Sequence, residues 1–222
     1  MANIYKIDSR HKVEIDLAKL HPWTKYKLCN LLNELAKKKI WAIVTSGYRS
    51  SDEQNKLYSQ GRTSKGAIIT NTRGGHSQHN WGIAVDLANN FDVDKDGKVT
   101  DDTWNEKGFS MIAKIAKSSK VGFKWGGDWS GFKDRPHFYI GDWGSTTQKL
   151  REKYGTYENF KKTWTCTVKC GTAIRKSKLF TSKHLKDVKA GTKLNLLWKS
   201  KLGYAKVEYN EIVGFIRVRN IK

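Results

Sequence analysis

The sequence predicts an α+β domain over residues 1–155, with a small antiparallel sheet and flanking helices, followed by an all-β barrel over residues 163–222. Up to about residue 155, helical apolar patterns alternate with short strand-like runs, which is typical of α+β domains. Beyond residue 163, four short apolar runs separated by glycine-containing turns indicate a small barrel. The intervening residues 154–162 are expected to form a linker or a short helix.

Three helices are predicted in the first domain. Residues 22–38 carry four leucines at helical spacing, and a proline lies in the first turn. A second helix begins at Ser50 or Ser51, because Glu53 and Gln54 complete a capping-box pattern with either serine. A third helix is expected over residues 102–117, carrying Trp104, Ile112 and Ile115.

Two of the expected strands bear chemically active side chains. Residues 41–46 are expected to form an apolar strand without such a side chain. Residues 82–87 are expected to form the next strand. In the latter, branched apolar residues alternate with small ones, and Asp86 is the single acid on the small face. A buried acid is costly unless it is paired or bound to a metal. A further short strand begins at His137, after Pro136, which keeps its predecessor extended.

His79, Asp86 and His137 together supply two nitrogen ligands and one oxygen ligand. Three protein ligands suit a catalytic zinc that keeps its fourth position for water. Asp134 is then a carboxylate that is not needed as a ligand, and it lies where a general base is expected. Each of these residues alone is more often structural, and their combination is what favours a metal site.

Three separated blocks resemble the zinc peptidases of the D-alanyl-D-alanine carboxypeptidase/VanY superfamily. The closest branch is the L-alanyl-D-glutamate endopeptidases of phage endolysins and bacterial autolysins, and the resemblance covers residues 15–145. The blocks are Ser77-x-His79-x-x-Gly82-x-Ala84-x-Asp86, Trp125-Gly126-Gly127-Asp128-Trp129 and Asp134-x-Pro136-His137-Phe138.

The resemblance implies a role for each matched residue. The zinc ligands are His79, Asp86 and His137, Asp134 is the acid/base, and Arg49 steadies the scissile carbonyl or its oxyanion. Substrate contacts are expected from Ser77, Trp125 and Trp129. Tyr139 departs from the pattern, since many relatives carry Glu or another polar residue there.

The implied reaction is hydrolysis of the L-Ala–D-Glu bond of the peptidoglycan stem peptide by zinc-activated water. One alternative within the class is a D-Ala-D-Ala carboxypeptidase. An alternative from another class is a non-catalytic wall-binding protein with a structural zinc. Asp134 discriminates between these classes, because a structural zinc needs no spare carboxylate.

The C-terminal segment resembles bacterial SH3 domains, which are wall-targeting modules, although this match is weaker than that of the peptidase blocks. The chain carries a formal charge of +21, and residues 163–222 hold 14 basic and 3 acidic side chains. The positive electrostatic potential of such a chain attracts polyanions, and anionic wall polymers are the expected partners. No nucleic-acid motif is visible, and no run approaches the roughly 20 apolar residues of a membrane span, so neither nucleic-acid binding nor stable membrane insertion is expected.

A calcium loop is a further hypothesis. Asp92, Asp94, Asp96 and Lys98 occupy positions 1, 3, 5 and 7 of an EF-hand-like loop, with glycine at position 6. Position 12 is a threonine in place of the bidentate Glu, and Asp101 or Asp102 could substitute for it. The alternative is a solvated acidic turn.

Residues 1–19 lack the apolar core of a secretory signal. We therefore expect synthesis in the host cytoplasm and action on the wall after release, as for a phage endolysin or an autolysin freed at lysis. The three cysteines, Cys29, Cys166 and Cys170, are expected to be reduced and structural.

Overall fold

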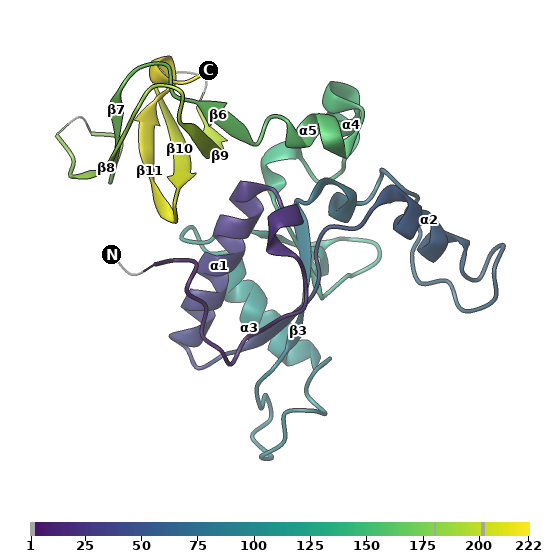
Figure 1. The fold of residues 1–222 in the computed structure, drawn as a ribbon. Coiled ribbons are helices and arrows are strands. Elements are labelled where there is room, and N and C mark those ends of the chain that lie inside the picture. Colours follow the sequence, from purple (N-terminus) through teal and green to yellow (C-terminus); the bar gives the residue numbers. More distant parts are fainter. Residues whose placement is uncertain (1–2, 180, 201–202) are drawn as a thin grey trace.

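The computed structural model describes residues 3–179, 181–200 and 203–222, and these form two regions (Figure 1). Each region has its own hydrophobic core. The first core belongs to the predicted α+β region and is built on a five-stranded sheet of order β1-β2-β3-β5-β4. Strand β1 runs parallel to β2, and the other neighbouring pairs are antiparallel. The strands are β1 (Lys12–Val13), β2 (Ala42–Ser46), β3 (Ala84–Asn89), β4 (Lys124–Trp125) and β5 (His137–Tyr139).

Helices α1 and α3 pack against this sheet and share its core (Figure 1). The branched face of β3 and the leucines of α1 are fully buried there, as the alternating patterns predict. Asp86 lies on the small face of β3 instead, which leaves that face of the sheet for a polar site. The helices are α1 (Pro22–Ala36), α2 (Ser51–Ser59), α3 (Glu106–Ala116), α4 (Gln148–Tyr154) and α5 (Tyr157–Lys161).

The starts of two helices follow from their caps. Helix α2 begins at Ser51, one of the two predicted starts, because the side chains of Ser50 and Glu53 form the capping box and make Ser50 the N-cap. Helix α3 begins four residues later than predicted, because Asn105 accepts a bond from the backbone of Lys107 and caps it. Trp104 therefore lies outside the helix and is exposed.

The C-terminal region is all-β, as predicted, and forms a six-stranded sheet of order β6-β9-β10-β11-β7-β8. The described strands do not close into a barrel, because no ladder joins the edge strands β6 and β8. The end of β6 pairs with the chain terminus instead, through a bridge between Val168 and Ile221. The strands are β6 (Thr165–Thr167), β7 (Thr172–Arg175), β8 (His184–Val188), β9 (Lys193–Lys199), β10 (Tyr204–Tyr209) and β11 (Ile212–Arg217).

The two regions touch through α1, and the short helix α5 occupies the expected linker between them. Strand β9 contacts α1, and the ammonium of Lys206 lies 4.0 Å from the ring centre of Tyr26. His21, the N-cap of α1, stacks on Phe160 of α5 with 5.2 Å between ring centres. These contacts tie the β region to the rest of the chain.

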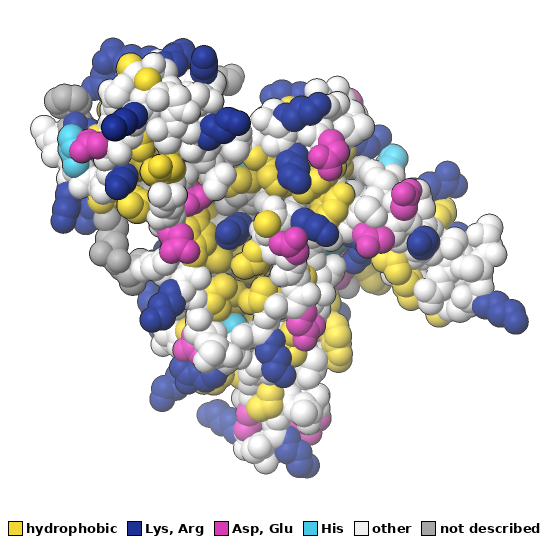
Figure 2. All heavy atoms as spheres, viewed as in Figure 1, with side chains coloured by type: hydrophobic (Ala, Val, Ile, Leu, Met, Phe, Trp, Pro, Cys, Tyr) yellow, Lys and Arg dark blue, Asp and Glu magenta, His cyan; other side chains and the backbone are white. Residues whose placement is uncertain are grey.

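Lysine and arginine side chains are spread over both regions on the face shown in Figure 2, with acidic groups between them. Within the described ranges, no helix is both long enough and apolar enough to cross a membrane. None of the three cysteines forms a disulfide: Cys29 and Cys166 are buried, and Cys170 is exposed.

Candidate metal centre

Three side chains from different elements converge on the polar face of the sheet. His79 comes from the short 3-10 helix Gln78–Trp81, Asp86 from β3 and His137 from β5. Asp86 and His137 are direct cross-strand partners, so the sheet register itself brings them together. The predicted ligands therefore meet, although 58 residues separate the two histidines.

The donor atoms form a nearly equilateral triangle. His79 Nε2 lies 3.2 Å from Asp86 Oδ1 and 3.2 Å from His137 Nδ1, and His137 Nδ1 lies 3.1 Å from Asp86 Oδ1. Ligands bound tetrahedrally to zinc at 2.0–2.1 Å stand about 3.3 Å apart, so the triangle has the size that zinc requires. Both histidines are buried, and Asp86 is half-buried.

The hydrogen bonds of the outer ring atoms support this assignment. His79 Nδ1 lies 2.7 Å from the carbonyl oxygen of Gly47, which can only accept, so the lone pair of His79 is on Nε2. His137 Nε2 lies 2.7 Å from Oε1 of Gln78. Burial alone would raise the pKa of Asp86, but interactions with the two histidines hold it well below its usual range. A cation is the natural occupant among these three atoms.

Asp134 lies in the loop before β5, half-buried beside the triangle but not part of it. Its backbone is fixed, because its N–H donates to Gly126 and its carbonyl accepts from His137 N–H at 3.3 Å. Burial raises the pKa of the Asp134 carboxyl, and the nearby Asp86 carboxylate raises it further, while His137 and His79 oppose these shifts. A carboxyl group with a raised pKa beside this triangle is what a general base or acid at a metal centre requires.

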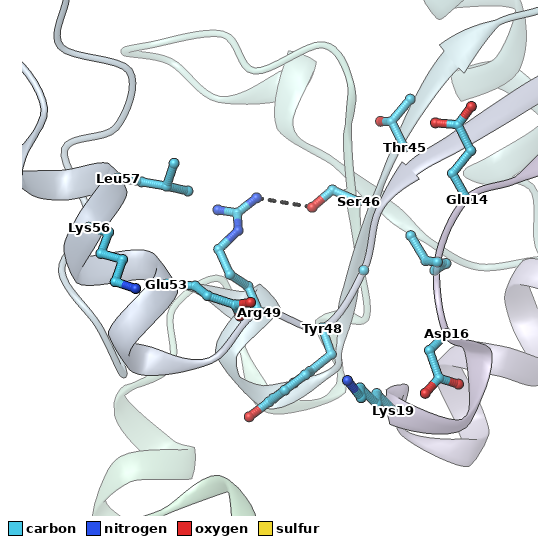
Figure 3. Close-up of a pocket in the computed structure, with 12 residues that line it drawn as sticks. Glu14, Asp16, Lys19, Thr45, Ser46, Tyr48, Arg49, Glu53, Lys56 and Leu57 are labelled. Atoms are coloured by element: carbon cyan, nitrogen blue, oxygen red, sulfur yellow. Dashed lines mark hydrogen bonds between the residues drawn. The ribbon is translucent and has the colours of Figure 1, made fainter. Parts of the chain in front are cut away.

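Arg49 follows β2 and points into a pocket of about 510 Å³ between α2 and the N-terminal segment that carries Glu14 and Asp16 (Figure 3). Its guanidinium donates to Ser46 Oγ at 3.0 Å and to Gln54 Oε1 at 2.9 Å. Ser46 pairs with Asp86 across the sheet, and Arg49 lowers the pKa of Asp134. Arg49 is therefore held on the metal side of the domain.

The residues expected to contact substrate have different surroundings. Ser77 caps the 3-10 helix by accepting from the backbone of His79, and Trp125 donates its indole N–H to the carbonyl of Arg135. Trp129 has its ring 5.4 Å from that of His137. The divergent Tyr139 also stacks near His137, at 5.7 Å, and receives a bond from Trp129. Of the two tryptophans, Trp129 is the one whose ring contacts the ring of His137.

A second acidic group lies in the predicted calcium loop. Carboxylate oxygens of Asp92, Asp94 and Asp102 lie within 4.8 Å of one another. Of the two candidate substitutes, Asp102 is the one that joins this group; it is buried and accepts a hydrogen bond from the backbone N–H of Val93. The carboxylate of Asp96 does not belong to this group.

Sequence reasoning missed two groups, Gln78 and the carbonyl of Gly47, which lie behind the histidine ligands. A glutamine between two motif residues looks like a spacer, and a main-chain carbonyl leaves no sequence signal. Gln78 is only 6% exposed, and burial of a glutamine beside a ligand is the signal that the fold adds.

A mixed sheet carrying a His-Asp-His triangle with a spare carboxylate defines a metallopeptidase-type centre. The model of a peptidase family described as D-alanyl-D-alanine carboxypeptidase matches residues 70–140, which hold all three ligands and Asp134. The chain is 44% identical over 122 residues to the peptidoglycan L-alanyl-D-glutamate endopeptidase CwlK of Bacillus subtilis, a match that covers 53% of this chain and 71% of that protein.

The chain therefore belongs to this M15 family of metallopeptidases. Among solved structures, it is similar to the L-Ala D-Glu endopeptidase ChiX of Serratia marcescens, with 25% identity and a TM-score of 0.40. That match covers 56% of this chain and 82% of the other.

Proposed function

We propose that the protein is a peptidoglycan hydrolase that cleaves the L-Ala–D-Glu bond of the stem peptide. The observation that carries this proposal is the spare carboxylate of Asp134 beside a complete three-ligand triangle, in a chain 44% identical to an L-alanyl-D-glutamate endopeptidase. A purely structural zinc has four protein ligands and no need of a neighbouring acid. The site therefore favours catalysis over the non-catalytic alternative.

His79, Asp86 and His137 would hold the zinc, which when bound lowers the pKa of water and polarises the amide carbonyl. Asp134 accepts the proton of the attacking water and later delivers it to the leaving nitrogen of D-Glu. Arg49 donates hydrogen bonds toward the oxygen that gains negative charge. Its bonds to Ser46 and Gln54 orient the guanidinium before the substrate arrives.

A synthetic stem peptide tests the reaction directly. Zinc-loaded protein should release L-Ala from a peptide that begins L-Ala–D-Glu, and chelation followed by zinc addition should abolish and then restore release. Removal of the terminal D-Ala instead would support the D-Ala-D-Ala carboxypeptidase alternative. Zinc binding without any cleavage would support the wall-binding alternative.

We further propose that the six-stranded C-terminal region is an SH3-like wall-binding domain. Its support is the all-β architecture and its excess of 14 basic over 3 acidic residues, which suits anionic wall polymers. Full-length protein inactivated at Asp134 should sediment with purified walls, and the bound fraction should fall as salt screens the charges. Sedimentation unchanged after the anionic polymers are extracted would contradict a role for charge.

The calcium loop is proposed on the convergence of Asp92, Asp94 and Asp102. Calcium should stabilise the zinc-loaded protein against heat, and Asp92→Asn should remove that effect. An identical melting temperature with and without calcium would identify a solvated acidic turn.

Release of the protein to the wall, as for a phage endolysin, stays a prediction. Co-expression with a membrane-permeabilising protein tests it, and host cells should then lyse.

A further inference from the structure

We propose that Gln78 is a positioning residue of the metal centre: its side-chain amide fixes the tautomer of His137, so that the lone pair of Nδ1 faces the metal. The proposal rests on the metal centre proposed above. It concerns a residue that touches neither the metal nor the substrate and that acts through His137.

The orientation of the amide follows from its two partners. Nε2 of Gln78 donates to the carbonyl oxygen of Ser145 at 3.1 Å. A carbonyl oxygen can only accept, so the NH₂ group must face Ser145 and Oε1 must face His137. Oε1 lies 2.7 Å from His137 Nε2, and an amide oxygen also only accepts. The ring proton of His137 is therefore on Nε2.

This proton position decides what the other ring nitrogen can do. A neutral imidazole carries one N–H, so Nδ1 of His137 keeps its lone pair, directed at Asp86 Oδ1 and His79 Nε2. In the other tautomer, Nδ1–H would donate to the Asp86 carboxylate and close the site by a charge-assisted hydrogen bond. In that tautomer, the lone pair of His137 Nε2 would also face a lone pair of Gln78 Oε1, and the two would repel each other. Gln78 thus disfavours the arrangement that competes with the metal.

The two histidines are secured in different ways. His79 is oriented by the main-chain carbonyl of Gly47, which no substitution removes. His137 depends on a side chain, and Gln78 is the residue just before His79. One short 3-10 helix therefore supplies one ligand and orients the other. Partners behind ligating histidines commonly contribute 10- to 100-fold in metal affinity or activity.

Zinc affinity measured by competition with a chelator tests this role without substrate. Gln78→Met keeps the length of the side chain and removes the acceptor, so the Kd for zinc should rise about 10- to 100-fold. Gln78→Glu restores an acceptor and should recover most of the affinity. The absorption spectrum of the cobalt-substituted protein should change in the methionine variant and return toward wild type in the glutamate variant.

Asn89→Leu is the matched control. Asn89 is also buried, and its amide donates to the main-chain carbonyls of Asp102 and Asn105 and to neither histidine. This variant should lose stability and keep the wild-type zinc affinity. If Gln78→Met binds zinc as tightly as wild type, or if Gln78→Glu is as weak as Gln78→Met, the proposal is wrong.

The tautomer itself can be observed in the wild-type protein, which guards against a variant that does not fold. Long-range nitrogen–proton NMR of the histidine rings should show the His137 proton on Nε2, both with and without zinc. A proton on Nδ1 in the zinc-free protein would overturn the proposal. Because neither measurement uses substrate, a failure of peptide cleavage would count against the proposed function and leave this inference intact.

Discussion

Asp134 and Asp86 are neighbouring acids whose surroundings shift their pKa values in opposite directions. Asp86 stands opposite His137 in the sheet register and is held ionised by the histidines. Asp134 is in a loop, with a pKa raised by burial and by the neighbouring carboxylate. The environments push the two pKa values apart, which is the pattern expected of a ligand and a proton-transfer group.

Replacing Asp134 by Asn should therefore abolish proton transfer and spare metal binding. General acid–base catalysis contributes about 100- to 10,000-fold, so kcat should fall by that factor while zinc content stays at wild type. Asp128→Asn is the control, because Asp128 is exposed and pairs with Lys117. Full activity in Asp134→Asn would show that another group is the base.

Arg49→Gln should lower kcat by about 100- to 1000-fold, the usual cost of removing one oxyanion donor. The structural reason is that Ser46 and Gln54 hold the guanidinium ready on the metal side. Arg62→Gln is matched to it, since Arg62 also donates several hydrogen bonds, to the end of α2 and to residues 70–71. Steady-state kinetics on the stem peptide distinguish the two, and equal effects would point to a general loss of charge.

At the scale of elements, Gly82 joins the ligand-bearing 3-10 helix to β3. Its φ is +63°, and a Cβ there would lie 2.7 Å from the carbonyl oxygen of Lys19. Gly82→Ala should thus destabilise the fold by more than the roughly 1–2 kcal/mol of a left-handed conformation alone. Gly191→Ala, with a φ of +83° and nothing within 4 Å of the added Cβ, carries only the cost of a positive φ. Chemical denaturation of both variants measures the difference, and equal losses would exclude the clash.

Local patterns predicted the elements that have strong local causes. The capping box at Ser50, the leucine face of α1 and the alternation in β3 are read from neighbouring residues, and each is confirmed. The start of α3 was missed because the N-cap is Asn105, and the preceding residues 102–104 lie outside the helix. The barrel closure was wrong because pairing between strand edges is a long-range property.

The site likewise combines residues that a local sequence pattern predicts with residues whose role depends on distant parts of the chain. His79, Asp86 and His137 have distinctive chemistry and spacing, and the fold brings them together. The contribution of Gln78 depends on a ring in another strand and on a carbonyl 67 residues away, which no local pattern encodes. Ser77 is a motif residue with a local structural role, because its side chain caps the 3-10 helix by accepting from the backbone N–H of His79.

For the whole molecule, His21 makes stability depend on pH. It lies among Phe160, Trp143 and Trp164 where α1 meets α5, and burial lowers its pKa to about 3. Between pH 3 and 6.5, the unfolded chain binds a proton at His21 that the folded chain does not, so stability falls as the pH falls through this window. His21→Asn retains a capping side chain without a titrating group.

Chemical denaturation at pH 7 and pH 4.5 tests this. The variant should be less stable than wild type at pH 7, because aromatic packing is lost, yet should lose less stability than wild type on acidification. An equal loss in both proteins would show that His21 is not responsible for the pH dependence.

Mass spectrometry of purified peptidoglycan, after digestion by the zinc-loaded protein and by its Asp134→Asn variant, tests the central claim most directly. The structure and the family predict new fragments with an N-terminal D-Glu from wild type and none from the variant. Walls left intact by the wild-type protein, or fragments that differ only by loss of terminal D-Ala, would contradict cleavage of the L-Ala–D-Glu bond.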